Sequence, residues 1–126
     1  MKIEEGLRGR LIDGKLPCAA AFELATELGI APIQVREKAD NEGIHISRCQ
    51  LGLFGFEEFG ERRIACPLAK VPKRIEEKMK AGLVNGSLPC VKAWRIAREE
   101  GIAKFLVGSA AETLSLRIGP CQLGCF

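Results

Sequence analysis

Apolar residues recur every three or four positions in three stretches near the start of the chain, and each stretch predicts an amphipathic helix. Proline favours a helix start and glycine a helix end, so the predicted helices run from about Ile3 to Gly14, from Pro17 to Gly29 and from about Pro32 to Glu42. Their inward-facing residues are Ile3, Leu7 and Leu11, then Ala21, Leu24, Ala25 and Leu28, then Ile33, Val35 and Ala39. An alternating stretch at residues 44–47 predicts one short strand.

The same pattern returns 72 residues later. Residues 1–54 align with residues 73–126 without a gap and share 22 identities, which include the hexapeptides CQLGLF at 49–54 and CQLGCF at 121–126. Because an internal repeat defines the structural unit, we interpret the chain as repeat 1 (1–54), a connector (55–72) and repeat 2 (73–126).

The size of each repeat bears on the fold. A unit of 54 residues buries too little surface to be stable alone, so we expect the two repeats to pack together. The predicted fold is mainly α, with two three-helix repeats that are each followed by one short β-strand and are packed as a pseudo-two-fold pair. We also expect the strands of the two repeats to pair with each other.

The hexapeptides carry apolar residues around a glycine, Leu51 and Phe54 in repeat 1 and Leu123 and Phe126 in repeat 2. This pattern predicts that each hexapeptide bends at its glycine and lays apolar side chains over the helices, with Phe126 buried. Deleting residues 124–126 is expected to lower the melting temperature by several degrees, because this apolar cover is lost. Thermal unfolding followed by circular dichroism measures the effect, and an unchanged melting temperature would rule the interpretation out.

The second and third predicted helices share a further pattern in the stretch AFELATELGIAPIQVREKADNEGI. Ala25 is small where two helices would cross, Gly29 lies in the turn, Ile30 follows it, and Val35 lies in the next helix. The equivalent residues of repeat 2 are Ala97, Gly101, Ile102 and Val107. This spacing resembles the helix-turn-helix of DNA-binding domains, and the trailing strand resembles the winged-helix variant.

The resemblance implies that the third helix of a repeat enters the major groove of DNA and that the second helix crosses the phosphate backbone. Side chains that donate hydrogen bonds to bases and phosphates occur on these helices in both repeats. The candidate nucleic-acid-binding residues are Gln34, Arg36, Lys38, Asn41, Arg48, Lys92, Arg95, Arg98 and Lys104.

Charge is distributed unequally between the repeats. Repeat 1 has 7 basic and 8 acidic residues and repeat 2 has 9 and 5, so the net charge of +3 comes from repeat 2. We therefore predict a DNA-binding transcriptional regulator in which repeat 1 reads bases and repeat 2 grips the phosphates of double-stranded DNA. The alternative is a protein-interaction or thiolate-metal-binding module that has the helix-turn-helix-like fold and binds a protein partner instead of DNA.

Cysteine supplies the other candidate chemistry. Four of the six cysteines are equivalent pairs in the two repeats, Cys18 with Cys90 and Cys49 with Cys121, and we expect them to be reduced thiols. Three roles stay open: packing in the core, a four-thiolate site for zinc or an iron–sulfur centre, and redox or covalent chemistry. The chain has no Cys-x-x-Cys motif, and Cys125 stands where repeat 1 has Leu53.

The sequence gives little support for catalysis, and we predict a protein that is not an enzyme. The only histidine, His45, is replaced by Arg117 in repeat 2, and we expect an exposed polar position there. No serine–histidine–aspartate set and no phosphate-binding glycine loop occurs. Without an apolar run of membrane-spanning length or a secretion leader, the expected location is the cytoplasm, with no membrane partner. Self-association of the chain stays open.

Overall fold

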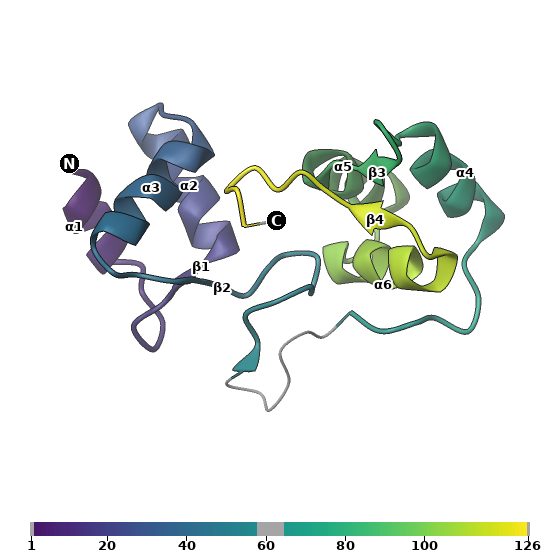
Figure 1. Ribbon diagram of the computed structural model, residues 1–126, viewed down its shortest axis with the longest axis horizontal. Coiled ribbons are helices and arrows are strands. Elements are labelled where there is room, and N and C mark those ends of the chain that lie inside the picture. Colours follow the sequence, from purple (N-terminus) through teal and green to yellow (C-terminus); the bar gives the residue numbers. More distant parts are fainter. Residues whose placement is uncertain (1, 58–64, 126) are drawn as a thin grey trace.

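The computed structural model describes residues 2–57 and 65–125, and these residues are mainly helical. The first half contains α1 (Ile3–Arg8), β1 (Leu16–Pro17), α2 (Cys18–Leu28), α3 (Pro32–Asn41) and β2 (Ile46–Ser47). The second half contains α4 (Lys73–Ala81), β3 (Ser87–Leu88), α5 (Cys90–Glu100), α6 (Lys104–Leu114) and β4 (Arg117–Ile118). Figure 1 shows the two sets of helices at opposite ends of an elongated molecule. The predicted order of elements is thus found twice, with one additional strand in each half.

The first helix of each half is shorter than predicted. Helix α1 ends at Arg8, and the chain then makes a tight hairpin in which Ile12 and Lys15 exchange backbone hydrogen bonds of 2.8 and 3.0 Å. Asp13 and Gly14 form its tip with φ of 51° and 75°, which is the left-handed backbone of a type I′ turn. Gly14 therefore belongs to a turn, and the prediction that it closes a helix was wrong. Gly86 has the same place in the second half, after Asn85.

The second and third helices largely follow the prediction. Gly29 ends α2 with φ of 66°, and Gly101 ends α5 with φ of 65°. Glycine adopts this left-handed backbone without steric cost, which explains the sharp stop. The predicted inward residues Val35 and Ala39 are completely buried. Ile33 is 39% exposed, so its predicted place in the core was wrong.

The short strands pair inside each half. Strand β1 pairs with β2, and β3 pairs with β4, both in parallel register. The expected pairing between the two repeats was wrong: each half contributes a second strand of its own, and Leu16 N of β1 donates to His45 O, directly before β2, at 2.9 Å. Each strand pair therefore lies within one half, and other segments must join the two halves.

The joining segments are the two hexapeptides, and each one crosses to the opposite half. Leu51 of repeat 1 is fully buried in the core built by α4, α5 and α6, which also contains Met79 and Val107. Leu123 of repeat 2 is fully buried in the core built by α1, α2 and α3, beside residues that include Val35. Figure 1 shows both crossings: the yellow C-terminal segment runs from β4 toward α2, and the teal segment after β2 runs toward α6. Each core thus depends on a leucine from the other half.

Two aromatic side chains join the halves at a second place. Phe22 of α2 and Trp94 of α5, which occupy equivalent positions in the repeats, meet edge to face with ring centroids 4.5 Å apart. Trp94 packs against both cores. Edge-to-face packing adds to the burial of apolar surface, so this contact also holds α2 and α5 together.

Candidate functional site

Helices α2 and α3 form a steep corner. The three residues from Gly29 to Ala31 connect them, and the chain turns through 112° between the two helix axes. Ala25 is 3% exposed and Val35 is fully buried, so small and apolar side chains fill the inside of the corner. The angle and the three-residue turn lie in the range found for helix-turn-helix pairs.

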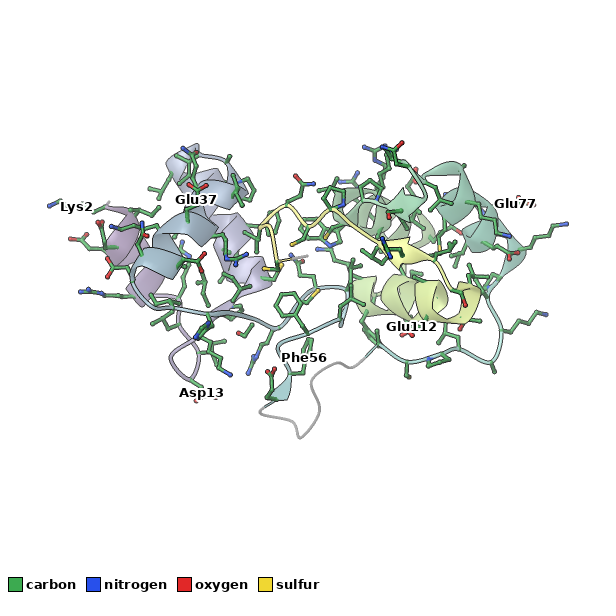
Figure 2. The ribbon with its side chains drawn as sticks, in the orientation of Figure 1. Lys2, Asp13, Glu37, Phe56, Glu77 and Glu112 are labelled. Atoms are coloured by element: carbon green, nitrogen blue, oxygen red, sulfur yellow. The ribbon has the colours of Figure 1, made fainter. Side chains whose placement is uncertain are left out.

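The outer face at the start of α3 is open to solvent. Ile33, Gln34 and Glu37 are exposed, and Figure 2 shows Glu37 on the outside of the first half. The side-chain oxygen of Gln34 accepts a 2.9 Å hydrogen bond from the backbone N–H of Ala31 and so caps the helix start. The side-chain amide nitrogen of Gln34 takes no part in this cap and can donate a hydrogen bond to a ligand. Asn41, the last residue of α3, is also exposed.

Two basic candidates on α3 are held by intramolecular contacts. The Arg36 Nε atom lies 3.1 Å from both carboxylate oxygens of Asp40, and its Nη1 atom donates to the backbone oxygen of Leu123 at 3.0 Å. The hydrogen bond to Asp40 raises the pKa of Arg36. Lys38 forms ion pairs with Glu4 at 2.9 Å and Glu42 at 3.6 Å, and the hydrogen bond to Glu4 raises its pKa. Both side chains are therefore held by partners within the chain.

The corresponding face of α6 is covered by the connector. The backbone N–H of Cys66 donates to the Ser109 hydroxyl at 3.2 Å, and that of Leu68 donates to the Thr113 hydroxyl at 2.6 Å. Ser109 is 1% exposed as a result. The third helix of repeat 2 is therefore closed to a large ligand on this side, whereas α3 is open.

Two of the four basic candidates of repeat 2 make contacts within the chain. Lys92 donates to the backbone oxygen of Gly82 at 3.3 Å, and Lys104 donates to Gln50 and lies 4.9 Å from the centre of the Trp94 ring. Arg95 and Arg98 are exposed on α5, and neither has an ion-pair partner among residues 2–57 and 65–125. Arg48, the remaining candidate, lies half-buried after β2 in a left-handed conformation with φ of 48°.

Three of the four cations of α4 are paired with nearby carboxylates. Lys78 and Arg74 contact Glu100 at 2.8 and 3.2 Å, and Lys80 contacts Glu76 at 3.3 Å. The hydrogen bond from Lys78 lowers the pKa of Glu100. These pairs leave α4 with little free positive charge for a polyanion.

All six cysteines are free thiols. Cys18, Cys49 and Cys90 are buried, and burial is the largest cause of the raised pKa of each, which reaches about 11 for Cys18. Cys90 lies close enough to Cys121, Cys18 and Cys49 for their charges to raise its pKa further. Within the described ranges 2–57 and 65–125, no group of three or more histidine, cysteine, aspartate or glutamate side chains is arranged to hold a metal ion. Cys18, Cys49 and Cys90 are thus buried neutral thiols, and Cys121 lies near them.

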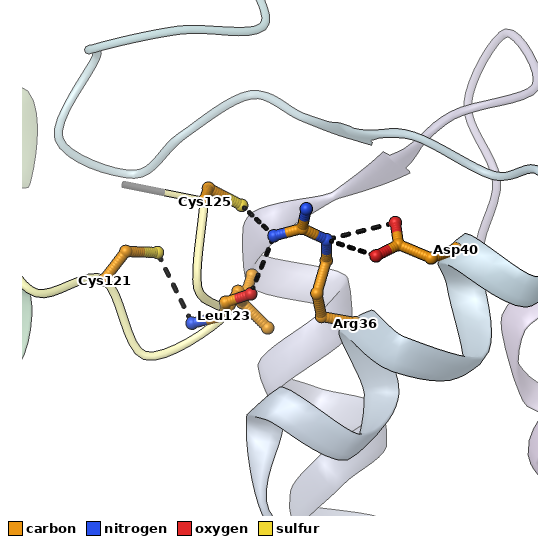
Figure 3. A network of polar contacts seen from close by, with 5 residues as sticks. All are labelled: Arg36, Asp40, Cys121, Leu123 and Cys125. Carbon is orange, nitrogen blue, oxygen red and sulfur yellow. Dashed lines mark hydrogen bonds and ion pairs between the residues drawn. The ribbon is translucent and has the colours of Figure 1, made fainter.

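Cys121 and Cys125 have a different environment. The backbone N–H of Leu123 donates to the Cys121 sulfur at 3.4 Å, and Arg36 Nη1 donates to the Cys125 sulfur at 3.6 Å (Figure 3). The Cys125 thiol donates toward the Cys121 sulfur and, with the backbone N–H groups around it, lowers the pKa of Cys121 to about 6. The same hydrogen bond raises the pKa of Cys125, because that thiol must give up its proton beside a thiolate. Sequence reasoning did not pair these two residues, although Cys125 is a departure from the repeat.

His45 is exposed, as predicted. No single helix within residues 2–57 and 65–125 is both long and apolar enough to cross a bilayer. Phe126, which was expected to be buried, lies outside the described residues.

No protein-family model, curated protein or solved structure matches this chain.

Proposed function

We propose that the protein is a DNA-binding regulator in which α3 of repeat 1 reads bases and α5 of repeat 2 contributes phosphate contacts. The observation that carries this proposal is the open outer face of α3 at the 112° corner with α2. In helix-turn-helix domains the start of the second helix of the pair reaches base edges in the major groove. Here that position presents Ile33, Gln34 and Glu37.

These three side chains suit base edges by their chemistry. An amide donor such as that of Gln34 matches an acceptor on a purine, an apolar group such as Ile33 packs on the methyl group of thymine, and a carboxylate such as Glu37 accepts from the amino group of cytosine. Arg95 and Arg98 of α5 are the exposed arginines that would neutralise phosphates. With about two phosphates neutralised, the affinity would depend only weakly on salt.

We further propose that the two repeats form a pseudo-two-fold pair. The exchange of the hexapeptides and the contact between Phe22 and Trp94 support this arrangement, since each hexapeptide packs into the opposite half and the two equivalent aromatic residues meet. In this arrangement repeat 2 stabilises the fold of repeat 1, because Leu123 is part of the core beneath α3.

A titration of random duplex DNA at low salt tests the proposed function. We expect a dissociation constant in the micromolar range, and log Kobs should fall against log salt with a slope of about −1.8 for two phosphate contacts. Replacing Arg95 and Arg98 together by glutamine is expected to bring the slope close to zero. A matched control removes the same charge from the ion-paired residues Arg74 and Lys80, and the slope of this control should stay near that of the wild type.

Two results would contradict this proposal: no shift at tens of micromolar protein would contradict DNA binding, and equal slopes for the two double variants would contradict the phosphate contacts of Arg95 and Arg98. The surface then favours the second candidate function, a protein-interaction module. Ile33 and Phe105 occupy equivalent positions at the start of α3 and α6, and each is 39% exposed. Exposed apolar side chains at the same place in both repeats are a feature of contact surfaces.

A further inference from the structure

The C-terminal hexapeptide brings two thiols together in a turn. The backbone N–H of Gly124 donates to the backbone oxygen of Cys121 at 3.0 Å, which closes a four-residue turn from Cys121 to Gly124. Cys125 follows directly, and its thiol faces the Cys121 sulfur. Cysteines brought this close by a turn can approach the Cα separation that a disulfide needs.

The surroundings favour an ionised sulfur at Cys121. The Cys125 thiol and the backbone N–H groups of Leu123, Gly124 and Cys125 lower the pKa of Cys121. The carboxylate in this network belongs to Asp40, where it is held by Arg36 Nε. Arg36 thus turns its cationic Nη1 toward the Cys125 sulfur, which stabilises negative charge there as well (Figure 3).

Small molecules can reach the pair. Cys121 and Cys125 are both half-exposed, and Cys125 lines a cavity of about 910 Å³ between the two halves, together with residues that include Arg36 and Leu116. The other cysteines differ: Cys18, Cys49 and Cys90 are buried, and Cys66 is exposed in the connector without a partner thiol. Only this pair among the six combines access, a neighbouring thiol and hydrogen-bond donors on both sulfurs.

We propose that Cys121 and Cys125 form a redox-active dithiol that is oxidised to an intramolecular disulfide by hydrogen peroxide, with Cys121 as the nucleophile and Cys125 as the resolving thiol. The Cys121 thiolate attacks one peroxide oxygen, the O–O bond breaks, and hydroxide leaves, which converts Cys121 to a sulfenic acid. The Cys125 sulfur then attacks the Cys121 sulfur, the S–O bond breaks, and the oxygen leaves as water with the Cys125 proton. Two thiols are oxidised, and one peroxide is reduced to two water molecules.

Repeat 1 supplies a natural comparison for this site. Cys49 begins the same hexapeptide, and backbone N–H groups of Leu53, Leu51 and Phe54 also point at its sulfur, yet its burial outweighs them and raises its pKa. Leu53 occupies the position of Cys125, so the first hexapeptide carries no second thiol. The proposed reactivity therefore depends on two features of the second hexapeptide. Cysteine replaces leucine at position 125, and Cys121 is half-exposed whereas Cys49 is buried.

Oxidation would change the contacts of α3. Disulfide formation removes the Cys125 thiol from the hydrogen bond with Arg36, and it tightens the turn that carries Leu123 into the first core. Arg36 belongs to the helix that the proposed function assigns to base reading. The dithiol chemistry itself does not depend on DNA binding, and its test uses no DNA.

Peroxide treatment of the full-length reduced protein, followed by alkylation and tryptic peptide mass analysis, tests the proposal. The C-terminal tryptic peptide, residues 118–126, contains Cys121 and Cys125 and no other cysteine. We expect this peptide to lose two hydrogen atoms at peroxide concentrations that leave Cys49 and Cys66 reduced. Cys125→Leu, which installs the residue of repeat 1, should instead accumulate a sulfenic acid at Cys121 that dimedone traps. Cys121→Ser should leave residue 125 unoxidised.

The pH dependence identifies the nucleophile. Alkylation of Cys121 in the reduced protein should be slow below pH 6 and reach its plateau above it, because the thiolate is the reactive form. For a thiol with an unperturbed pKa, the rate of alkylation would rise near pH 8.5. The proposal is overturned if Cys66 is oxidised before the C-terminal peptide, if the two cysteines form disulfides between chains only, or if Cys121→Ser and Cys125→Leu are oxidised equally while both keep the helical circular dichroism spectrum of the wild type.

Discussion

Replacing Leu51 by alanine is expected to lower the free energy of unfolding by about 3 kcal/mol, and the damage should appear in the opposite half of the chain. Leu51 is fully buried among residues of α4, α5 and α6, although it follows β2 in the sequence. Truncating a buried leucine loses the transfer free energy of its methyl groups and leaves a cavity, which together explain the size of the effect. Chemical denaturation measures the loss, and amide hydrogen exchange locates it.

Leu123→Ala is the reciprocal variant, and exchange should then accelerate in α1, α2 and α3. Ile12→Ala is a suitable control, because Ile12 is 41% exposed, and its effect should stay within about 0.5 kcal/mol. If Leu51→Ala accelerated exchange in its own half and left α5 and α6 protected, the exchange of hexapeptides would be contradicted.

Gly108→Ala should destabilise the protein by about 2 to 3 kcal/mol, although the same change in most helices is stabilising. Gly108 lies inside α6, and a Cβ atom built on it would come within 2.1 Å of the Leu51 backbone oxygen. This oxygen belongs to the hexapeptide of the other half and cannot move aside as a flexible side chain would. The alanine must therefore displace the hexapeptide from α6 and withdraw Leu51 from the core.

Gly9→Ala provides the matched control for this change. Gly9 caps α1 with φ of −72°, and the nearest atom to its built Cβ is the Glu5 backbone oxygen at 3.5 Å. Alanine fits this backbone, so the control is expected to be neutral or to stabilise by up to about 1 kcal/mol. Thermal and denaturant unfolding of both variants gives the comparison, and a stabilising effect of Gly108→Ala would contradict the close approach of the hexapeptide.

The pair Arg36 and Gly108 shows how the two halves differ at one repeated position. In the first half, Arg36 reaches the backbone oxygen of Leu123 with its guanidinium group, whereas in the second half the backbone oxygen of Leu51 lies directly against the glycine. The same hexapeptide is thus held by a hydrogen bond in one place and by close backbone packing in the other. Repeat 1 is left with an open α3, and repeat 2 with a covered α6.

Local patterns in the sequence predicted much of each half. The spacing of apolar residues and the glycines that end α2 and α5 gave helices near their observed bounds, because both signals act within one turn of helix. The hairpin at Asp13 and Gly14 was missed because glycine near a helix end also fits a C-cap, although the aspartate–glycine dipeptide is also typical of the type I′ turn that the backbone adopts. The remaining features of the fold depend on contacts between residues that lie far apart in the chain.

Local patterns in the sequence could not predict that each hexapeptide packs in the opposite half, or that basic side chains of α3 have partners elsewhere in the chain. An apolar residue such as Leu51 reports that it is buried but not which of two similar cores receives it. In the same way, Lys38 has the composition of a DNA-binding face, and its partner Glu4 lies on another helix, so the pair becomes visible only in the folded chain. The substitution of Leu53 by Cys125 was the one local signal that pointed to the dithiol.

The most direct test of the exchanged hexapeptides is a nuclear Overhauser experiment on protein with labelled methyl groups. The account predicts cross-peaks from the Leu51 methyl groups to core residues of the second half, such as Met79 and Val107, and from the Leu123 methyl groups to core residues of the first half, such as Val35. Cross-peaks from Leu51 only to residues of α1, α2 and α3, and from Leu123 only to residues of α4, α5 and α6, would contradict it.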